Sequence, residues 1–217
     1  MVNVFLSYHH NARKTAGRVK DCLSVVGMDV FLAHEDLEPS AEWQKEIFQR
    51  LRHCDVFIPL LTRSFHGSLW TDQETGIAVA WKKLVLPLKF SVDPYGFIGK
   101  FQALKARKEL DETCWKIVHN LASKPAFGES MRDGVISAFL GSRNFAESGW
   151  LAQPLLKLEP FSSAQLKRIV EGGAKNQQIY GGRAARDVVN KLIAKNRPRL
   201  KRSLVRKFEE QVKSWPY

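Results

Sequence analysis

The sequence predicts an α/β protein, with a doubly wound parallel sheet followed by a small helical module. Three observations predict this class. Short apolar runs alternate with stretches of helical period over residues 2–121, polar loops follow three of these runs, and only helical periods remain after residue 125. Alternating strands and helices form parallel sheets through right-handed crossovers, which place ligand-binding loops at the carboxyl ends of the strands.

The chain opens with a strand, a polar loop and a helix. The run VNVFLSY (2–8) is apolar and rich in β-forming residues. After the loop HHNARK, apolar side chains recur at helical spacing at Ala16, Val19, Cys22, Leu23 and Val26. Gly27 is placed to end this helix as the residue after its C-cap. The run MDVFL (28–32) then predicts a second strand.

The next elements continue the alternation. The polar loop AHEDLEPSAEW (33–43) leads to a helix that contains Ile47 and Leu51 and is capped near Ser40. The continuous apolar run CDVFIPLL (54–61) is typical of a strand buried on both faces of a parallel sheet. The loop TRSFHGS, a helix from about residue 70 to 82 and a strand at 84–90 follow.

The pattern weakens after residue 90, where Pro94, Gly96 and Gly99 indicate a loop. We expect a short last strand at 106–110, a closing helix at 114–121, and a linker in SKPAFGES (123–130). The predicted domains are therefore 1–125 and 126–217. In the second, helical periods cover 131–140, 149–158, a segment capped by Ser162 or Ser163, the stretch from 179 to 193, and 200–212.

Composition is that of an ordinary globular protein, with 44% hydrophobic and 26% charged residues. No signal-peptide pattern and no run of about 18 apolar residues is present, so we expect a cytoplasmic protein without a membrane segment. Three cysteines, Cys22, Cys54 and Cys114, are odd in number and far apart, which indicates buried thiols and neither a disulfide framework nor a zinc site.

The positive charge is concentrated near the carboxyl terminus. Residues 151–217 hold 15 Lys and Arg against 5 Asp and Glu, or +10 of the total +12. The stretch KNRPRLKRSLVRK (195–207) could bind nucleic acid, form a solvated helix face or dock on an acidic protein. Aromatic residues are nearly absent from it until Trp215 and Tyr217, which does not support base stacking. We favour the solvated or protein-docking face over nucleic acid.

Several common catalytic patterns are missing. The sequence has no G-x-S-x-G nucleophile elbow, no P-loop and no G-x-G-x-x-G after a strand. These absences disfavour a serine hydrolase, a P-loop NTPase and a Rossmann oxidoreductase. His9 and His10 are adjacent but lack partners at metal-ligand spacing, so no metal is predicted.

The motifs themselves, in their order, resemble those of the TIR (Toll/interleukin-1 receptor-like) domain family, which has a flavodoxin-like fold. The resemblance covers about the first 125 residues. It is carried by VFLSY, by AHEDLEPS at the place of the family's BB loop, by CDVFIPLLTRSF, and above all by SLWTDQE. A Trp-x-x-x-Glu after a serine-bearing loop is the pattern of catalytically active TIR domains, which cleave NAD+. The last 80 to 90 residues carry no such resemblance.

The resemblance implies that Glu74 is the catalytic carboxylate, which would stabilise positive charge developing on the ribose of NAD+. The alternative from the residues alone is a solvated acid in the first turn of a helix. Trp70, one turn earlier, would form an aromatic wall beside the carboxylate or would simply be a packing residue. NAD+ would be the substrate, and no cofactor is expected.

Further substrate contacts are carried over from the family, and for Trp43, Phe31 and Tyr8 a packing role is the favoured alternative. Phe31 and Trp43 could stack on nicotinamide or adenine, and Arg13 could contact the pyrophosphate. Residues that follow the first strand could contact phosphate or ribose: Ser7, Tyr8, His9 and His10.

The functional prediction is an NAD+ glycohydrolase or cyclase that releases nicotinamide and ADP-ribose or a cyclic ADP-ribose isomer. The resemblance implies a role in prokaryotic anti-phage defence signalling and homo-oligomers formed by TIR–TIR contacts. The alternative is a non-catalytic TIR–TIR interaction module, in which Glu74→Ala would leave function intact. The helical module would sense, oligomerise or dock on a protein partner.

Overall fold

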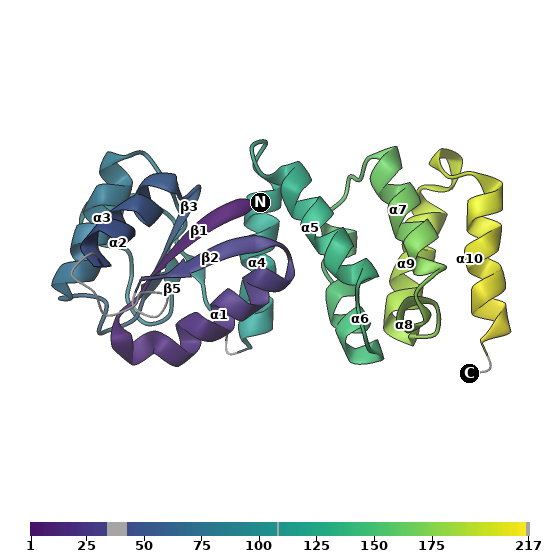
Figure 1. Cartoon of the computed structure of the whole chain (residues 1–217), viewed down its shortest axis with the longest axis horizontal. Helices are drawn as coiled ribbons and strands as arrows, with labels where there is room; N and C mark the ends of the chain where they lie inside the picture. Colours follow the sequence, from purple (N-terminus) through teal and green to yellow (C-terminus); the bar gives the residue numbers. More distant parts are fainter. Residues whose placement is uncertain (34–42, 108, 216–217) are drawn as a thin grey trace. The chain divides into compact units, whose positions relative to one another are not determined.

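The computed structural model describes residues 1–33, 43–107 and 109–215. The chain divides into two compact units, 1–118 and 119–217, whereas the sequence places the boundary after residue 125. All strands belong to the first unit, and the helices after α4 belong to the second (Figure 1). The expected BB loop and the expected cap at Ser40 lie outside the described residues.

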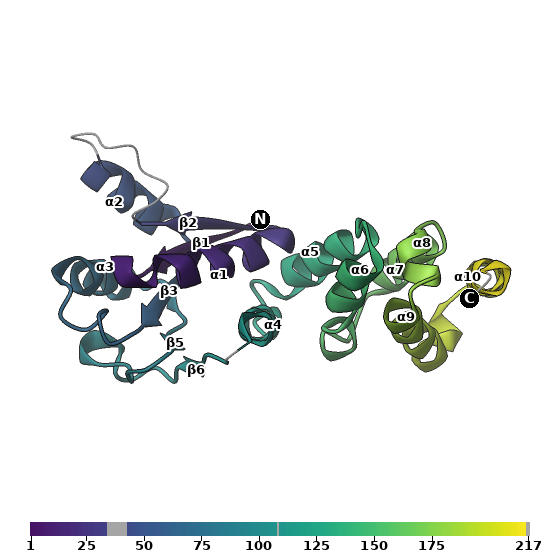
Figure 2. The same cartoon turned by 90° about the horizontal axis from the view of Figure 1, so that it is seen from below.

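The first unit is built on a parallel sheet with strand order β2-β1-β3-β5-β6, which can be followed across Figure 2, and β4 pairs with β3. Val4 lies beside Val30 of β2 and Val56 of β3, so β1 is a central strand. This confirms the predicted α/β class with its parallel sheet. The strands are β1 (Val2–Ser7), β2 (Met28–Leu32), β3 (Val56–Leu61), β4 (Leu84–Val85), β5 (Leu88–Lys89) and β6 (Leu104–Lys105).

Two expectations about strands are corrected. The predicted strand at 84–90 is two short strands, β4 and β5, separated by Leu86 and Pro87. Proline has no N–H to donate to a ladder, so continuous pairing is interrupted there. The last strand is β6 and does not extend over 106–110, because Leu110 already begins a helix.

Helices flank the sheet in the first unit. They are α1 (Arg13–Val25), α2 (Trp43–His53), α3 (Leu69–Ala80) and α4 (Leu110–Ala122), with 3-10 helices η1 (His10–Ala12) and η2 (Gly96–Ile98). Gly27 follows α1 with φ 82, the left-handed conformation that glycine adopts without a Cβ clash, as the sequence predicted.

One face of the sheet is covered by α2 and α3. Phe5 of β1 forms a buried cluster with Ile47 and Leu51 of α2 and with Ala78 of α3. Side chains alternate between the faces of a strand, so Ser7, two residues after Phe5, points to this same face. The packing therefore aims the last side chain of β1 at the helices that follow β2 and β3.

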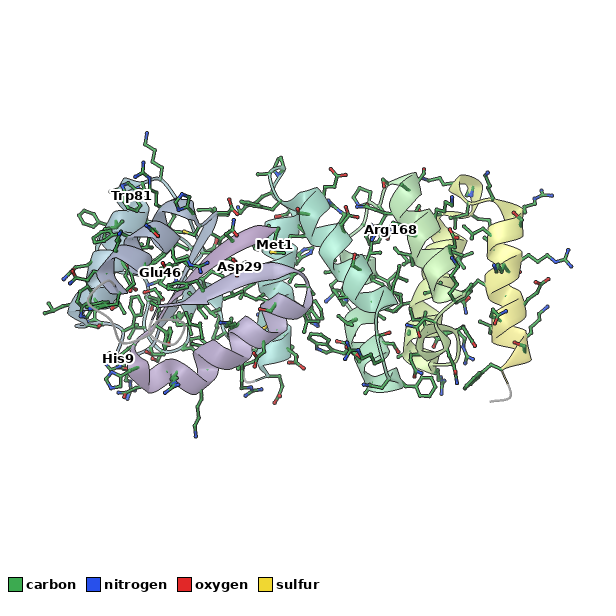
Figure 3. The ribbon with its side chains drawn as sticks, viewed as in Figure 1. Met1, His9, Asp29, Glu46, Trp81 and Arg168 are labelled. Atoms are coloured by element: carbon green, nitrogen blue, oxygen red, sulfur yellow. The ribbon has the colours of Figure 1, made fainter. Side chains whose placement is uncertain are left out.

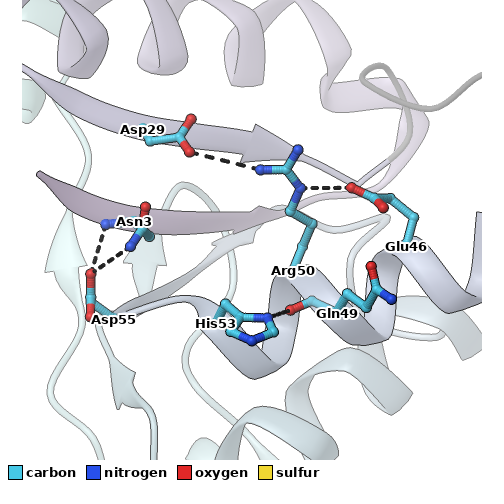
Figure 4. A network of polar contacts seen from close by, with 7 residues as sticks. All are labelled: Asn3, Asp29, Glu46, Gln49, Arg50, His53 and Asp55. Carbon is cyan, nitrogen blue, oxygen red and sulfur yellow. Dashed lines mark hydrogen bonds and ion pairs between the residues drawn. The ribbon is translucent and has the colours of Figure 1, made fainter.

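Polar contacts at the opposite end of the strands join the sheet to α2 and to the segment that follows it (Figure 4). Arg50 pairs with Glu46 at 2.7 Å on its own helix and with Asp29 of β2 at 3.8 Å. Asn3 donates to the carboxylate of Asp55 from both its backbone and its side-chain nitrogen. The side chains of both ion pairs are exposed, and exposed ion pairs contribute about 0 to 1 kcal/mol, so these pairs add little to stability.

The second unit is entirely helical where the structure describes it. Its helices are α5 (Gly128–Leu140), α6 (Phe145–Ala152), α7 (Ser163–Gly173), α8 (Gln177–Tyr180), α9 (Arg183–Lys195) and α10 (Arg202–Ser214), with η3 (Leu155–Lys157) and η4 (Arg197–Arg199). Phe139, Leu192 and Phe208 are fully buried in its core. Arg168, labelled in Figure 3, pairs with Asp133 at 2.9 Å and joins α7 to α5.

Local signals explain the ends of these helices. The side chain of Asn144 accepts a hydrogen bond from the Glu147 N–H at the start of α6. The expected helix at 149–158 is not continuous: α6 ends at Ala152, and a separate 3-10 helix, η3, follows Pro154. Ser162 caps α7 in a reciprocal capping box with Gln165. No helix among the described residues combines the length and the apolar character needed to cross a membrane.

Candidate active site

Helix α3 carries polar side chains on the face that it turns to the sheet. Its buried residues are Thr71, Glu74, Thr75 and Ala78, which follow the i, i+3, i+4, i+7 spacing of one helix face. The two threonine hydroxyls are satisfied by backbone carbonyls. Thr71 Oγ1 donates to Phe65 O at 2.9 Å, and Thr75 Oγ1 donates to Thr71 O at 2.6 Å. Glu74 is the one ionisable member of this face.

Glu74 is almost fully enclosed, with 1% of its surface exposed. Its Oε2 accepts a hydrogen bond of 2.5 Å from Ser7 Oγ, and its Oε1 has no hydrogen-bond partner among the described residues. The interpretation of Glu74 as a solvated first-turn acid is therefore wrong. That place belongs to Asp72, which is exposed in the first turn of α3.

Burial determines the protonation of Glu74. Loss of solvation raises the pKa of the Glu74 carboxyl to about 7, and the hydrogen bond from Ser7 opposes this by favouring the ionised form. No charged side chain among the described residues contributes to the shift. A buried carboxylate without a cationic partner destabilises a fold, and such groups are concentrated at functional sites.

Two tryptophans at the starts of α2 and α3 contact each other. Trp43 begins α2, and Trp70 lies on α3 one turn before Glu74. Their rings contact edge to face with centroids 4.4 Å apart, and Trp70 remains 36% exposed. The structure thus pairs two aromatic residues that the sequence proposed separately as contacts to a substrate.

The residues after β1 lie at the carboxyl end of that strand. Tyr8 is fully buried, and the Nδ1 of His9 accepts a hydrogen bond from the Asn11 N–H at 3.3 Å, which caps η1. The His9 ring, labelled in Figure 3, lies 4.0 Å from the His10 ring. Partial burial and the neighbouring His10 lower the pKa of His9. Arg13 is exposed at the start of α1. Contacts of these residues with a substrate stay predictions.

Phe31 is a member of the hydrophobic core and is 5% exposed. Its ring lies 5.3 Å from the Phe5 ring, and the guanidinium of Arg50 lies 5.2 Å from its centroid. Both neighbours are part of the packing of α2 on the sheet. A stacking role for Phe31 stays a prediction.

One polar cluster beside the site has no counterpart in the sequence analysis. Tyr95 donates its hydroxyl to Asp72 Oδ1 at 2.6 Å, and its ring lies 4.4 Å from the His66 ring. The contact joins the first turn of α3 to the loop before η2. No local signal predicts it, since the residues are 23 positions apart and each is an ordinary surface residue by type. Within the described residues no group of three His, Cys, Asp or Glu could hold a metal ion.

Comparison with known protein families shows which family the first unit belongs to. A family model described as TIR domain matches residues 4–118, more than half of the 217 residues. The chain belongs to the TIR domain family. The match ends where the first compact unit ends, so Ser7, Trp43, Trp70 and Glu74 all lie within the TIR domain. Comparison with curated proteins gives no match.

TIR domains include NAD+-cleaving enzymes and scaffold modules, and they commonly self-associate. Membership of the family is therefore compatible with an enzyme and with a scaffold module. The helical module after residue 118 lies outside the matched range.

Proposed function

We propose that this TIR domain cleaves NAD+ at the bond between nicotinamide and ribose, with Glu74 as its catalytic carboxylate. The observation that carries the proposal is the enclosed Glu74 side chain, which has one oxygen held by Ser7 and the other unpartnered among the described residues. Ser7 ends β1, so the carboxyl group lies at the carboxyl end of the sheet, where α/β proteins bind ligands.

The chemistry requires one carboxylate and no general acid. As the glycosidic C–N bond breaks, its electron pair goes to the pyridinium nitrogen, and nicotinamide leaves as a neutral molecule. Positive charge moves to the anomeric carbon and the ring oxygen of the ribose. A carboxylate beside the ribose stabilises this charge and binds its hydroxyls. Water then adds to the anomeric carbon and releases a proton to solvent, which gives ADP-ribose, or a nucleophilic atom of the same molecule adds there to give a cyclic isomer.

The pKa of Glu74 suits a group that becomes fully ionised when the substrate binds. A carboxyl with pKa about 7 is half protonated at neutral pH. The pyridinium ring of NAD+ carries a positive charge, and an opposite charge nearby lowers the pKa of a carboxyl. Substrate binding would therefore produce the charged form that the reaction needs.

Aromatic and cationic residues near the strand ends supply the other proposed contacts. Trp70 and Trp43 would provide apolar walls for nicotinamide or adenine, and Arg13 is exposed and could contact the pyrophosphate. Because only 1% of Glu74 is exposed, NAD+ must displace the side chains that enclose it. Self-association of TIR domains could provide that rearrangement, and the activity would then rise with protein concentration. NAD+ depletion or a cyclic product would suit anti-phage defence.

The test is NAD+ consumption with chromatographic identification of the products, at low and high protein concentration. Wild type is compared with Glu74→Gln, which keeps the side-chain shape, and with Asp72→Asn, which removes an exposed carboxylate two residues away on the same helix. We expect nicotinamide release by wild type and by Asp72→Asn, and a loss of at least about 100-fold in Glu74→Gln, the size typical for removal of one stabilising group. Equal rates in wild type and Glu74→Gln would refute the catalytic role.

A non-catalytic interaction module is the second candidate, and exposed apolar side chains favour it. Leu69 of α3 is 78% exposed and Phe97 of η2 is 74% exposed, on two elements that contact each other. Exposed apolar surface is typical of protein contacts. This candidate predicts that Leu69→Ser weakens self-association measured by sedimentation while no variant releases nicotinamide.

A further inference from the structure

We propose that Ser7 is a positioning residue for Glu74, which holds Oε2 and so leaves Oε1 to meet the ribose. This rests on the proposed function of Glu74. The resemblance led us to expect Ser7 among the substrate contacts, and its place in the structure points to a different role.

The Ser7 hydroxyl donates its one hydrogen bond to Glu74. The Ser7 side chain is fully buried, and its single hydroxyl proton is donated to Glu74 Oε2 at 2.5 Å. A serine hydroxyl has one proton to donate, so Ser7 cannot also donate to a phosphate or a ribose hydroxyl while it holds Glu74. When Glu74 is ionised this bond is charge-assisted, and hydrogen bonds to ionised groups are about twice as strong as neutral ones.

The position of Ser7 in the sheet makes it a firm support. Strand β1 is paired on both sides, with β2 and with β3, and Ser7 is the last residue of the strand. Functional side chains are held more precisely from central strands than from loops. The neighbouring hydroxyls of Thr71 and Thr75 are bonded to carbonyls of their own segment. Ser7 is thus the hydrogen-bond partner that the structure provides for Glu74.

The orientation has a chemical consequence. With Oε2 bonded to Ser7, Oε1 is the carboxyl oxygen that receives no hydrogen bond from a described residue, and it is buried. A ribose hydroxyl that donates to Oε1 would leave the bond between Oε2 and Ser7 intact, with both acceptor positions of Oε1 still open to it. Removing the hydroxyl would allow the carboxyl group to rotate, so that Oε1 would spend less time in the orientation that the reaction needs.

The same hydrogen bond acts on protonation. Burial raises the pKa of Glu74, and the Ser7 hydroxyl lowers it. Among the described residues no charged side chain adds to these two effects. Asp72 accepts a hydrogen bond from Tyr95, and His9 Nδ1 accepts one from the Asn11 N–H. Loss of the Ser7 hydroxyl should therefore raise the pKa of Glu74 by about one to two pH units, from the usual strength of a hydrogen bond to a charged group.

The experiment compares wild type, Ser7→Ala and Ser7→Thr, the last of which restores a hydroxyl. Carbon-13 NMR of labelled glutamate carboxyl groups follows the titration, and Glu74→Gln assigns the Glu74 signal. Initial rates of NAD+ cleavage are measured from pH 6 to 9. We expect the Glu74 midpoint to rise in Ser7→Ala and to stay near wild type in Ser7→Thr. We also expect kcat to fall about tenfold or more with KM little changed, and part of the loss to be recovered at high pH.

Two results overturn the proposal. An unchanged Glu74 midpoint in a folded Ser7→Ala protein, with a raised KM and an unshifted pH profile, means that Ser7 contacts the substrate and does not position Glu74. If wild type releases no nicotinamide at any concentration, the proposed function fails, and the role of Ser7 in it falls too. The NMR midpoints separate these cases, since a shift in Ser7→Ala shows the hydrogen bond even in an inactive protein.

Discussion

Trp43 at the start of α2 and Trp70 near the start of α3 contact each other edge to face, with their ring centroids 4.4 Å apart. The contact ties together the two helices that cover the Glu74 face of the sheet. Aromatic pairs in this arrangement contribute about 0.5 to 1.5 kcal/mol beyond the area that they bury.

A double-mutant cycle with Trp43→Leu and Trp70→Leu should therefore give a coupling energy in that range, measured by urea unfolding. Each single variant loses the contact, so the double variant should lose less stability than the sum of the two. If the stability lost by the double variant equals the sum of the two single losses within about 0.3 kcal/mol, the rings do not stabilise each other.

Ionisation of Glu74 should reduce the stability of wild type relative to Glu74→Gln. The folded pKa is about 7, above the ordinary value of 4.5, so the folded state binds this proton more tightly than the unfolded state. The stabilising contribution of the protonated group is complete below pH 4.5 and is lost as the pH rises through 7. Between these values the wild type should lose roughly 3 kcal/mol relative to Glu74→Gln.

Urea unfolding of both proteins from pH 4 to 9 measures this difference, and the other titrating groups cancel because they are common to the two. A difference that is constant across the range would show that Glu74 titrates normally and is not enclosed as the structure has it.

Tyr95 should titrate at unusually high pH because of its burial and its contact with Asp72. Desolvation, the hydrogen bond to Asp72 and the charge of Asp72 all raise the pKa of the Tyr95 phenol. We expect Asp72→Asn to lower that pKa toward the ordinary value of 10, as measured by ultraviolet absorbance at alkaline pH with Tyr95→Phe to assign the transition. Because Asp72 is exposed, Tyr95→Phe should reduce stability by no more than about 1 kcal/mol.

The capping box of α7 gives a matched pair of variants in the helical module. Ser162 Oγ accepts a hydrogen bond from the Gln165 N–H at 3.1 Å, and the Ser162 N–H donates one to Gln165 Oε1 at 3.0 Å. Ser162→Ala should destabilise the module by about 1 kcal/mol, whereas Ser163→Ala, one residue inside the helix, should change stability much less. Thermal unfolding that ranks the two variants in the opposite order would refute the cap.

Much of the fold follows from local patterns. The apolar runs at 2–8 and 54–61 and the helical period after Tyr8 predicted β1, β3 and α1, because burial on a sheet or along one helix face imposes those periods. The predicted strand limits were wrong where pairing with a neighbouring strand determines them. β5 and β6 are two residues each, and their limits depend on which neighbour accepts their hydrogen bonds. Ser162 and Ser163 were equivalent candidates in sequence, and helix phase selected Ser162.

The sequence by itself determined the parallel α/β class and the helical module, since these depend on periods within short segments, and its resemblance to the TIR family made Glu74 a candidate. The tertiary structure alone decided the partners of that candidate. Ser7 lies 67 residues from Glu74, and Tyr95 lies 23 residues from Asp72. Whether Glu74 is solvated or enclosed depends on how α3 is rotated against β1, and packing of the whole sheet sets that rotation. The environment that raises the pKa of Glu74 is therefore a property of the assembled fold.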